Sequence, residues 1–358
     1  MRSGAVRFGG FLIFVGVFVL SLEYVNWAAF EPAQRANFVI AGGIALLIAF
    51  GLALGSRSHF LDEFLHLLAL AIGATILGLF VSGSGAGDWV SLAGPVRADK
   101  TLSFDGSFSS DAAMPSITLQ LTNGDATVQT WDRESYQIIV HARARGWSQS
   151  EAEEALAKAK LQPEILDTSI TFTVPREPLS LSRVEADVEV FLPKDHFYEL
   201  RLETLNGSLG LTTIHATRVF LKTLNGRITL GDVTAQQSAT LETLNGRISG
   251  RLATGEGTAS TANGEIKLIL GSVSGTYHVS ALNGRIDLQV PEDPQNEIGY
   301  SISARTWSGS VTIGLPNFIS SEQEQERRRV EGSTSNFTSA STKITIQANT
   351  TNGSIEIR

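Results

Sequence analysis

The dipeptide Asn-Gly recurs through this chain at a nearly fixed interval. From Asn206 to Asn283 the steps between successive copies are 19, 20, 18 and 20 residues, and the hexapeptide around it hardly changes between 202–207, 221–226 and 241–246. A period of this length is the signature of a repeat architecture. The full set of copies is Asn123-Gly124, Asn206-Gly207, Asn225-Gly226, Asn245-Gly246, Asn263-Gly264, Asn283-Gly284 and Asn352-Gly353.

Apolar and polar residues alternate on both sides of each Asn-Gly. Leu221 and Thr223 precede one copy, Ile228 and Leu230 follow it, and the other units place similar residues at the same offsets. Period-two alternation is typical of strands. We therefore expect two strands per unit, joined at Asn-Gly, with these aligned positions facing a common core.

Two folds can use this pattern. Asn-Gly is a tight hairpin turn in one and a corner between strands of a β-solenoid coil in the other. A hairpin of ordinary strands takes about ten residues and leaves half of each unit unused, so the spacing favours an all-β solenoid whose ~20-residue coils stack about 4.8 Å apart. Glycine then accepts a positive φ at the corner, and the Asn amides are expected to form an inward ladder. The corners are thus predicted to be structural.

The positions expected to face outward suggest a contact surface. Arginines that follow the corner glycine could hold an anionic glycan, although solvated rim charges are the alternative. Leucines that precede the Asn would form an apolar stripe, which is either covered by another element or used for binding. The candidate residues are Arg227, Arg247, Arg285, Leu205, Leu224 and Leu244.

Three apolar runs fill the N-terminal region, at about 8–30, 38–55 and 64–83. Each is close to the ~20 residues that span a bilayer, so residues 1–83 are predicted to contain three transmembrane α-helices. The first run also resembles a signal peptide, and its cleavage would leave two helices.

Charges around these runs predict the orientation. Arg2 and Arg7 place the N-terminus in the cytoplasm, so the chain leaves the third helix on the outer side of the membrane, as it also does if the first run is cleaved. Residues 84–100, rich in Gly and Ser at their start, are expected to be a linker. The β-solenoid domain is expected to cover 101–358.

Irregular segments flank the repeats. Strands are expected within 101–146, followed by one short amphipathic helix at about 149–161, capped by Ser148 and placed over an end or side of the core. The charged segment at about 320–335 is expected to be a loop, and residues 343–358 are expected to form the last coil.

Composition and motifs limit the chemistry. The chain has no cysteine, which excludes disulfides and thiolate metal sites. Its net charge of −8 falls entirely after residue 87, which disfavours nucleic-acid binding. No nucleophile elbow, HExxH or phosphate loop occurs, and no carboxylate pair recurs in adjacent units. We expect no catalytic residue, no metal and no cofactor.

The order of segments resembles a known family. Strands around Thr122-Asn123-Gly124-Asp125, an acidic-then-basic helix, ITFTVP, VEVFLP and then the TLNG units are similar to the bacterial and archaeal "putative adhesin" family of β-strand-repeat domains, whose function is unknown. The resemblance covers about 100–315 and extends to 340–358. It implies the solenoid fold, often carried on membrane helices, and brings no catalytic motif. The three-helix anchor is not part of the family pattern.

These features predict a membrane-anchored module displayed outside the cell. We expect it to be non-catalytic and adhesin-like, with a cell-wall glycan or a surface protein as its partner. The alternative is an envelope-sensing or accessory protein that acts with a membrane partner, since three helices exceed what an anchor needs. A β-helix enzyme acting on polysaccharides is the third reading.

Overall fold

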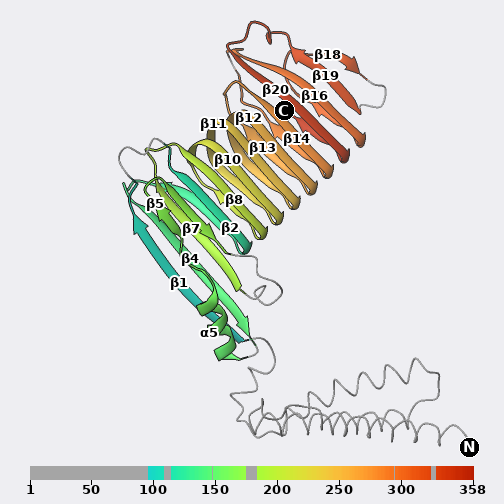
Figure 1. Ribbon diagram of the computed structural model, residues 1–358. Helices are drawn as coiled ribbons and strands as arrows, with labels where there is room; N and C mark the ends of the chain where they lie inside the picture. The colour runs from blue at the N-terminus through green and yellow to red at the C-terminus, as the bar shows by residue number, and fades with distance from the viewer. Residues whose placement is uncertain (1–95, 109–113, 147, 175–183, 294, 324–327) are drawn as a thin grey trace, which may run out of the picture. The chain divides into compact units, whose positions relative to one another are not determined.

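The structure is a computed structural model that describes residues 96–108, 114–146, 148–174, 184–293, 295–323 and 328–358. Residues Val96–Arg358 form one compact unit (Figure 1). The three predicted membrane spans lie outside the described residues. Among the residues that are described, no helix has the length and apolar character needed to cross a bilayer.

The unit is a β-solenoid with two walls. Each coil contributes one strand that ends at an Asn-Gly corner and one that begins after it. Strands of each kind pair in parallel with their counterparts in the neighbouring coils. We call the sheet of strands that end at the corner the first wall, and the other sheet the second wall. The solenoid predicted from the spacing is therefore correct, and the hairpin alternative is wrong.

Both walls extend along the whole stack. In stacking order, the first wall contains β5 (Glu164–Leu166), β6 (Ser169–Thr173), β2 (Ser116–Asn123), β8 (Tyr198–Asn206), β10 (Ile214–Asn225), the second halves of β11 (Ile228–Asn245) and β12 (Ile248–Asn263), β14 (Gly275–Asn283), β20 (Thr342–Asn352), β16 (Ile298–Ser308), β19 (Arg329–Thr334) and β18 (Phe318–Gln323). The second wall contains β1 (Val96–Gly106), β4 (Tyr136–Gly146), β7 (Val184–Pro193), β3 (Ala126–Trp131), β9 (Leu209–Leu211), the first halves of β11 and β12, β13 (Ile266–Leu270), β15 (Ile286–Gln289), β21 (Ile355–Ile357) and β17 (Val311–Ile313).

Alternating residues of both walls form the core. Leu221 of the first wall and Ile228 and Leu230 of the second are buried, as are their equivalents along the stack except Gly250 and Ile313, which are half-buried. The predicted inward positions are thus confirmed. Because each coil covers the apolar edge of the next, the core is continuous from one end of the solenoid to the other.

Chain order and stacking order differ at the C-terminal end. The expectation that 343–358 forms the last coil is wrong, because β20 pairs with both β14 and β16, and β21 with both β15 and β17. The last segment of the chain is therefore inserted between two earlier coils. The physical reason lies at the corner: Asn352 can continue the row of asparagines, whereas the equivalent residue of β16 is Ser308. At the other end, β2 likewise lies between β6 and β8.

Two boundaries differ from those expected. Strand β1 begins at Val96, inside the predicted 84–100 linker, because it pairs antiparallel with β4 along its whole length. The charged segment 320–335 is not simply a loop, since β18 and β19 form an antiparallel pair there. Strand β19 covers the edge of β16 and buries Val330, which protects an otherwise open sheet edge.

Helix α5 (Gln149–Lys158) is close to the predicted range. Ser148 caps it, with its hydroxyl oxygen accepting from the Glu151 backbone N–H at 3.2 Å. The helix ends earlier than expected, because Ala159 already has extended backbone angles. Ala152 and Leu156 are buried where the helix contacts β4 and β1, so α5 covers the N-terminal end of the second wall.

Candidate functional site

The asparagine side chains form one continuous ladder along the corner edge. From Asn206 onward, each side-chain amide nitrogen donates to the side-chain oxygen of the preceding Asn in the stack, with donor–acceptor distances of 2.7 to 2.9 Å. The prediction of an inward ladder is wrong in its direction, since all members except Asn123 are exposed. The Asn stands where the first wall ends and the chain turns into the second wall, so its side chain reaches solvent at this edge and not the core between the walls. In stacking order the members are Asn123, Asn206, Asn225, Asn245, Asn263, Asn283 and Asn352.

Glycine is required at the corner mainly because of close stacking. A Cβ on Gly226 would lie 1.7 Å from the carbonyl oxygen of Gly207, and one on Gly246 would lie 1.8 Å from that of Gly226. The predicted positive φ occurs at Gly124, Gly207, Gly264 and Gly353 but not at Gly226, Gly246 or Gly284. Close approach of successive coils is thus the more general reason for the residue.

Threonines two positions before the Asn stabilise the same corner from inside. The Thr223 hydroxyl donates to the Gly207 carbonyl at 2.9 Å, and Thr243 donates to Gly226 at 3.1 Å. The coil ending at Asn283 departs from this pattern, because Ala281 stands at the threonine position. Side-chain amides and buried hydroxyls therefore bond successive corners together on both sides of the backbone.

Most of the candidate arginines are paired with carboxylates. Arg247 contacts Glu265 at 2.9 Å, and Arg285 contacts Glu356. Arg227 is exposed, and no carboxylate of the described residues pairs with it. The predicted basic strip is therefore largely neutralised, and it does not gather into a site.

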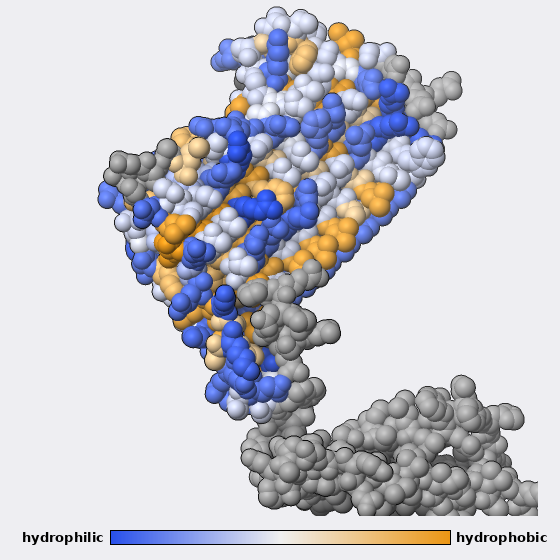
Figure 2. Space-filling model, viewed as in Figure 1, coloured by the Kyte–Doolittle hydropathy of each residue, from blue (hydrophilic) through white to orange (hydrophobic). Residues whose placement is uncertain are grey.

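The predicted leucine stripe lies on the outer face of the first wall. Leu205 is half-buried, whereas Leu224 and Leu244 are 41% and 45% exposed. Further along the same row, Leu282 is 52% exposed and Trp307 is 71% exposed. Figure 2 shows a band of apolar surface along the edge where the first-wall strands end. We call this row, from Leu205 to Trp307, the apolar stripe, although Ala262 and Thr351 stand at two of its positions.

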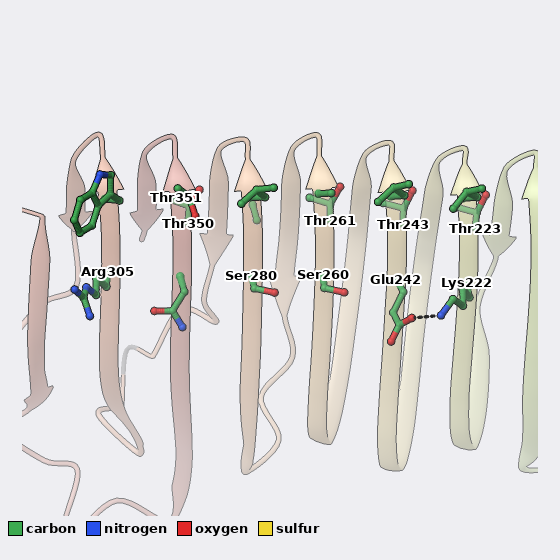
Figure 3. A pocket seen from close by; sticks show the side chains of 17 residues that line it. Lys222, Thr223, Glu242, Thr243, Ser260, Thr261, Ser280, Arg305, Thr350 and Thr351 are labelled. Atoms are coloured by element: carbon green, nitrogen blue, oxygen red, sulfur yellow. Dashed lines mark ion pairs between the residues drawn. The ribbon is translucent and has the colours of Figure 1, made fainter.

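A groove of about 760 Å³ has the apolar stripe as one of its sides, from Leu224 to Trp307 (Figure 3). It crosses β10, β11, β12, β14, β20 and β16. Ser260 and Ser280 line its middle, while longer side chains stand at its ends. Lys222 and Glu242 form an ion pair of 2.8 Å at one end, where the hydrogen bond to Glu242 raises the pKa of Lys222. At the other end lie Arg305 and Trp307, each on β16.

Three groove residues could not be found from the repeat pattern: Arg305, Trp307 and Asn349. Arg305 and Trp307 come from β16, whose turn carries Ser308-Gly309 instead of Asn-Gly. Alignment of Ser308 with Asn352 puts Trp307 at the leucine position and Arg305 at the position of Lys222 and Glu242. Asn349 shares this row, but only because β20 is inserted beside β16.

Other titratable groups have structural roles. Burial and then the nearby Asp293 carboxylate raise the pKa of Tyr300 to about 12, and its hydroxyl donates to the Pro291 carbonyl at 3.1 Å. Burial also raises the pKa of Tyr198, whose hydroxyl donates to Pro193. Within the described part of the chain, no three His, Asp or Glu side chains gather closely enough to hold a metal ion.

Comparisons with known proteins find one family model and several solved structures. The family model "Toastrack DUF4097" matches residues 114–358. A putative cell adhesion protein from Clostridium sporogenes is 15% identical, with 74% of this chain and 98% of that chain covered and a TM-score of 0.34. A putative adhesin from Parabacteroides merdae is 10% identical, covering 73% and 96%, with a TM-score of 0.38. A putative lipid binding protein from Parabacteroides distasonis is 10% identical, covering 73% and 97%, with a TM-score of 0.34.

Proposed function

This chain belongs to the Toastrack DUF4097 family, and from that premise we propose that it is a non-catalytic, adhesin-like binding module. The module is displayed outside the cell and anchored by membrane helices at 8–30, 38–55 and 64–83. Its partner is a polymer or protein of the cell envelope or of a neighbouring surface.

One observation carries the proposal: within the part of the chain that the structure describes, no other element covers the long outer face of the first wall, where Leu224, Leu244 and Trp307 are exposed. The apolar stripe runs along it next to the groove, and both cross several coils. Because the coils repeat every ~4.8 Å, contacts along this surface are periodic. Periodic weak contacts to an extended partner add up to useful avidity.

The exposure of the apolar stripe itself indicates binding, because it leaves large apolar side chains in contact with water. Large exposed apolar side chains are usually scattered, whereas several that gather along one edge mark an interaction surface. Leu224, Leu244 and Leu282 are not needed for the core, since the inward positions of the same strands already fill it. Their outward placement supports a binding role.

Protease treatment of intact cells tests the proposed display. A tag at each end of the chain reports which part is cut. We expect loss of the C-terminal tag and survival of the N-terminal tag, because only the solenoid lies outside. Protection of the C-terminal tag after selective removal of any outer barrier would place the domain in the cytoplasm and contradict the proposal.

A further inference from the structure

We propose that the groove on the outer face of the first wall binds an acidic polysaccharide that lies along the stack. In this arrangement Arg305 pairs with a sugar carboxylate and Trp307 packs against a sugar ring. The inference deepens the proposed function by naming a ligand class for the module, and it rests on that function.

The shape of the groove suits an extended chain. It spans six neighbouring first-wall strands, from β10 to β16. Five steps of about 4.8 Å correspond to a length of roughly 24 Å. The small side chains Ser260, Ala262 and Ser280 form its middle and leave room for a ligand between the bulkier ends. A linear polymer can follow such a groove, whereas a compact ligand would use only part of it.

Hydrogen-bonding groups line up across the strands of the groove. Arg305 lies opposite Asn349 in the β16–β20 pair, Asn349 lies opposite Ser280, and Ser280 lies opposite Ser260. A guanidinium, an amide and two hydroxyls therefore stand in one row. No hydrogen bond joins the Asn349 amide or these two serine hydroxyls to other described residues. Free donors and acceptors at regular spacing match the hydroxyl-rich edge of a polysaccharide.

Arg305 supplies the preference for an acidic sugar. Lys222, Arg247 and Arg285 each pair with a carboxylate of this chain. Arg305 is exposed, and no such pair forms with it within the part of the chain that the structure describes. A guanidinium binds a carboxylate through two parallel hydrogen bonds. The groove therefore has a specific place for one carboxylate.

Trp307 supplies an apolar platform beside that cation. Its side chain is 71% exposed, two residues from Arg305 on the same outer face of β16. Indole is large and apolar over most of its surface, with one N–H at its edge. Its ring can pack against the C–H face of a sugar while Arg305 and Asn349 bind polar groups. Leu282 adds a second large apolar side chain two strands further, beyond Thr351.

The overall charge narrows the ligand class further. The whole chain carries a net charge of −8, so a densely sulfated or phosphorylated polymer meets general repulsion. A polymer in which uronic acids alternate with neutral sugars brings a carboxylate to Arg305 at lower charge density. We expect that class to bind better than either a neutral glucan or heparin.

Binding measurements on the purified full chain, immobilised through an N-terminal tag, test this site. The probes are hyaluronan oligosaccharides, dextran and heparin. We expect hyaluronan to bind, and Arg305→Gln and Trp307→Ala each to weaken its binding at least tenfold. Arg227→Gln is the matched control, since Arg227 is also exposed without a carboxylate partner in the described region. All three variants change exposed side chains, and unchanged thermal unfolding verifies their fold.

Several outcomes would overturn the proposal. Failure of hyaluronan to bind, or equal binding by Arg305→Gln and the wild type, removes the acidic-sugar site. Binding to phosphatidylglycerol vesicles that depends on Trp307 assigns the groove to lipid instead. Dimerisation that Trp307→Ala abolishes assigns it to a second copy of the chain. The display test is independent: external display without sugar binding contradicts only this site, and a binding-competent domain found in the cytoplasm contradicts only the surface role.

Discussion

The central coils and the inserted C-terminal coil have the same Asn-Gly corner, but the residues that bond there are separated by different lengths of chain. In the centre, each strand pairs with one about a coil away in sequence, as Asn245 does with Asn225, 20 residues earlier. At the C-terminal end, Asn352 bonds to Asn283 across 69 residues. The same local chemistry therefore works at short and long sequence separation. The entropy of loop closure differs, so the centre is expected to form first and the inserted coil later.

The largest loss of stability is expected from a substitution at a corner in the centre of the stack. Gly246→Ala places a methyl group against the Gly226 carbonyl, where an ideal Cβ lies only 1.8 Å away. We expect a loss of about 3 kcal/mol or more in the free energy of unfolding, measured by urea denaturation. Gly210→Ala is the control, because its nearest contact would be an ordinary 3.4 Å. Equal stability of the two variants would show that the coils can separate at the corner without cost.

A core truncation in the inserted coil tests whether the C-terminal end unfolds separately. Ile346→Ala removes a fully buried side chain of β20 and should cost about 3 kcal/mol. Because only neighbouring coils are in contact, we expect hydrogen exchange to increase in β16 and β20 while β10 stays protected. Leu241→Ala is the matching truncation in the central strand β11, and it should increase hydrogen exchange in the neighbouring strands on both sides, β10 and β12. A uniform increase for Ile346→Ala would mean that the solenoid unfolds as one unit.

Alkaline pH tests the same end through Tyr300. Its pKa in the folded state is raised to about 12 from an ordinary value of 10.0. The folded state thus holds the proton more tightly, and stability is retained below pH 10 and lost as the pH rises from 10 towards 12. At pH 11 this residue alone should cost about 1 kcal/mol. Denaturation at pH 9, 10 and 11 measures the loss, and Tyr300→Phe should reduce it. An unchanged slope in that variant would assign the effect to other tyrosines.

The threonines that bond the corner glycine carbonyls suggest a substitution that raises stability. Ala281→Thr restores the hydroxyl missing from one coil and should donate to the Gly264 carbonyl, which receives no threonine bond. We expect a stabilisation of about 1 kcal/mol. The reverse change, Thr243→Val, removes an existing bond to Gly226 and should destabilise by a similar amount. Thermal unfolding of both variants gives the comparison, and destabilisation by Ala281→Thr would show that the inserted methyl does not fit.

The smallest change in stability is expected at the arginines that follow the corner glycines and pair with carboxylates. Glu265→Gln breaks the exposed ion pair with Arg247 and should change stability by no more than about 0.5 kcal/mol. Any effect should disappear in high salt, because exposed pairs are screened. A larger change that persists in salt would mean that the row contributes to the stack beyond simple charge pairing.

The sequence by itself determined the repeating part of this protein. Period-two alternation around Asn-Gly fixed which residues enter the core, and a ~20-residue period implied one coil per unit. Both are local properties that every unit repeats, so one sequence contains the pattern several times. The short helix could also be predicted, because its cap and its apolar positions lie within a few residues of one another.

Only the tertiary structure decided the order of coils at the ends and the composition of the groove. Insertion of β20 beside β16 depends on long-range pairing, which sequence spacing does not encode. That pairing brings Asn349 opposite Arg305 and makes Ser280 their neighbour. The direction of the Asn ladder was also decided there, because alternation predicts an inward side chain while the turn of both walls at the corner directs it to solvent. Local periodicity thus specifies the coil, and the stacking of distant segments creates the candidate site.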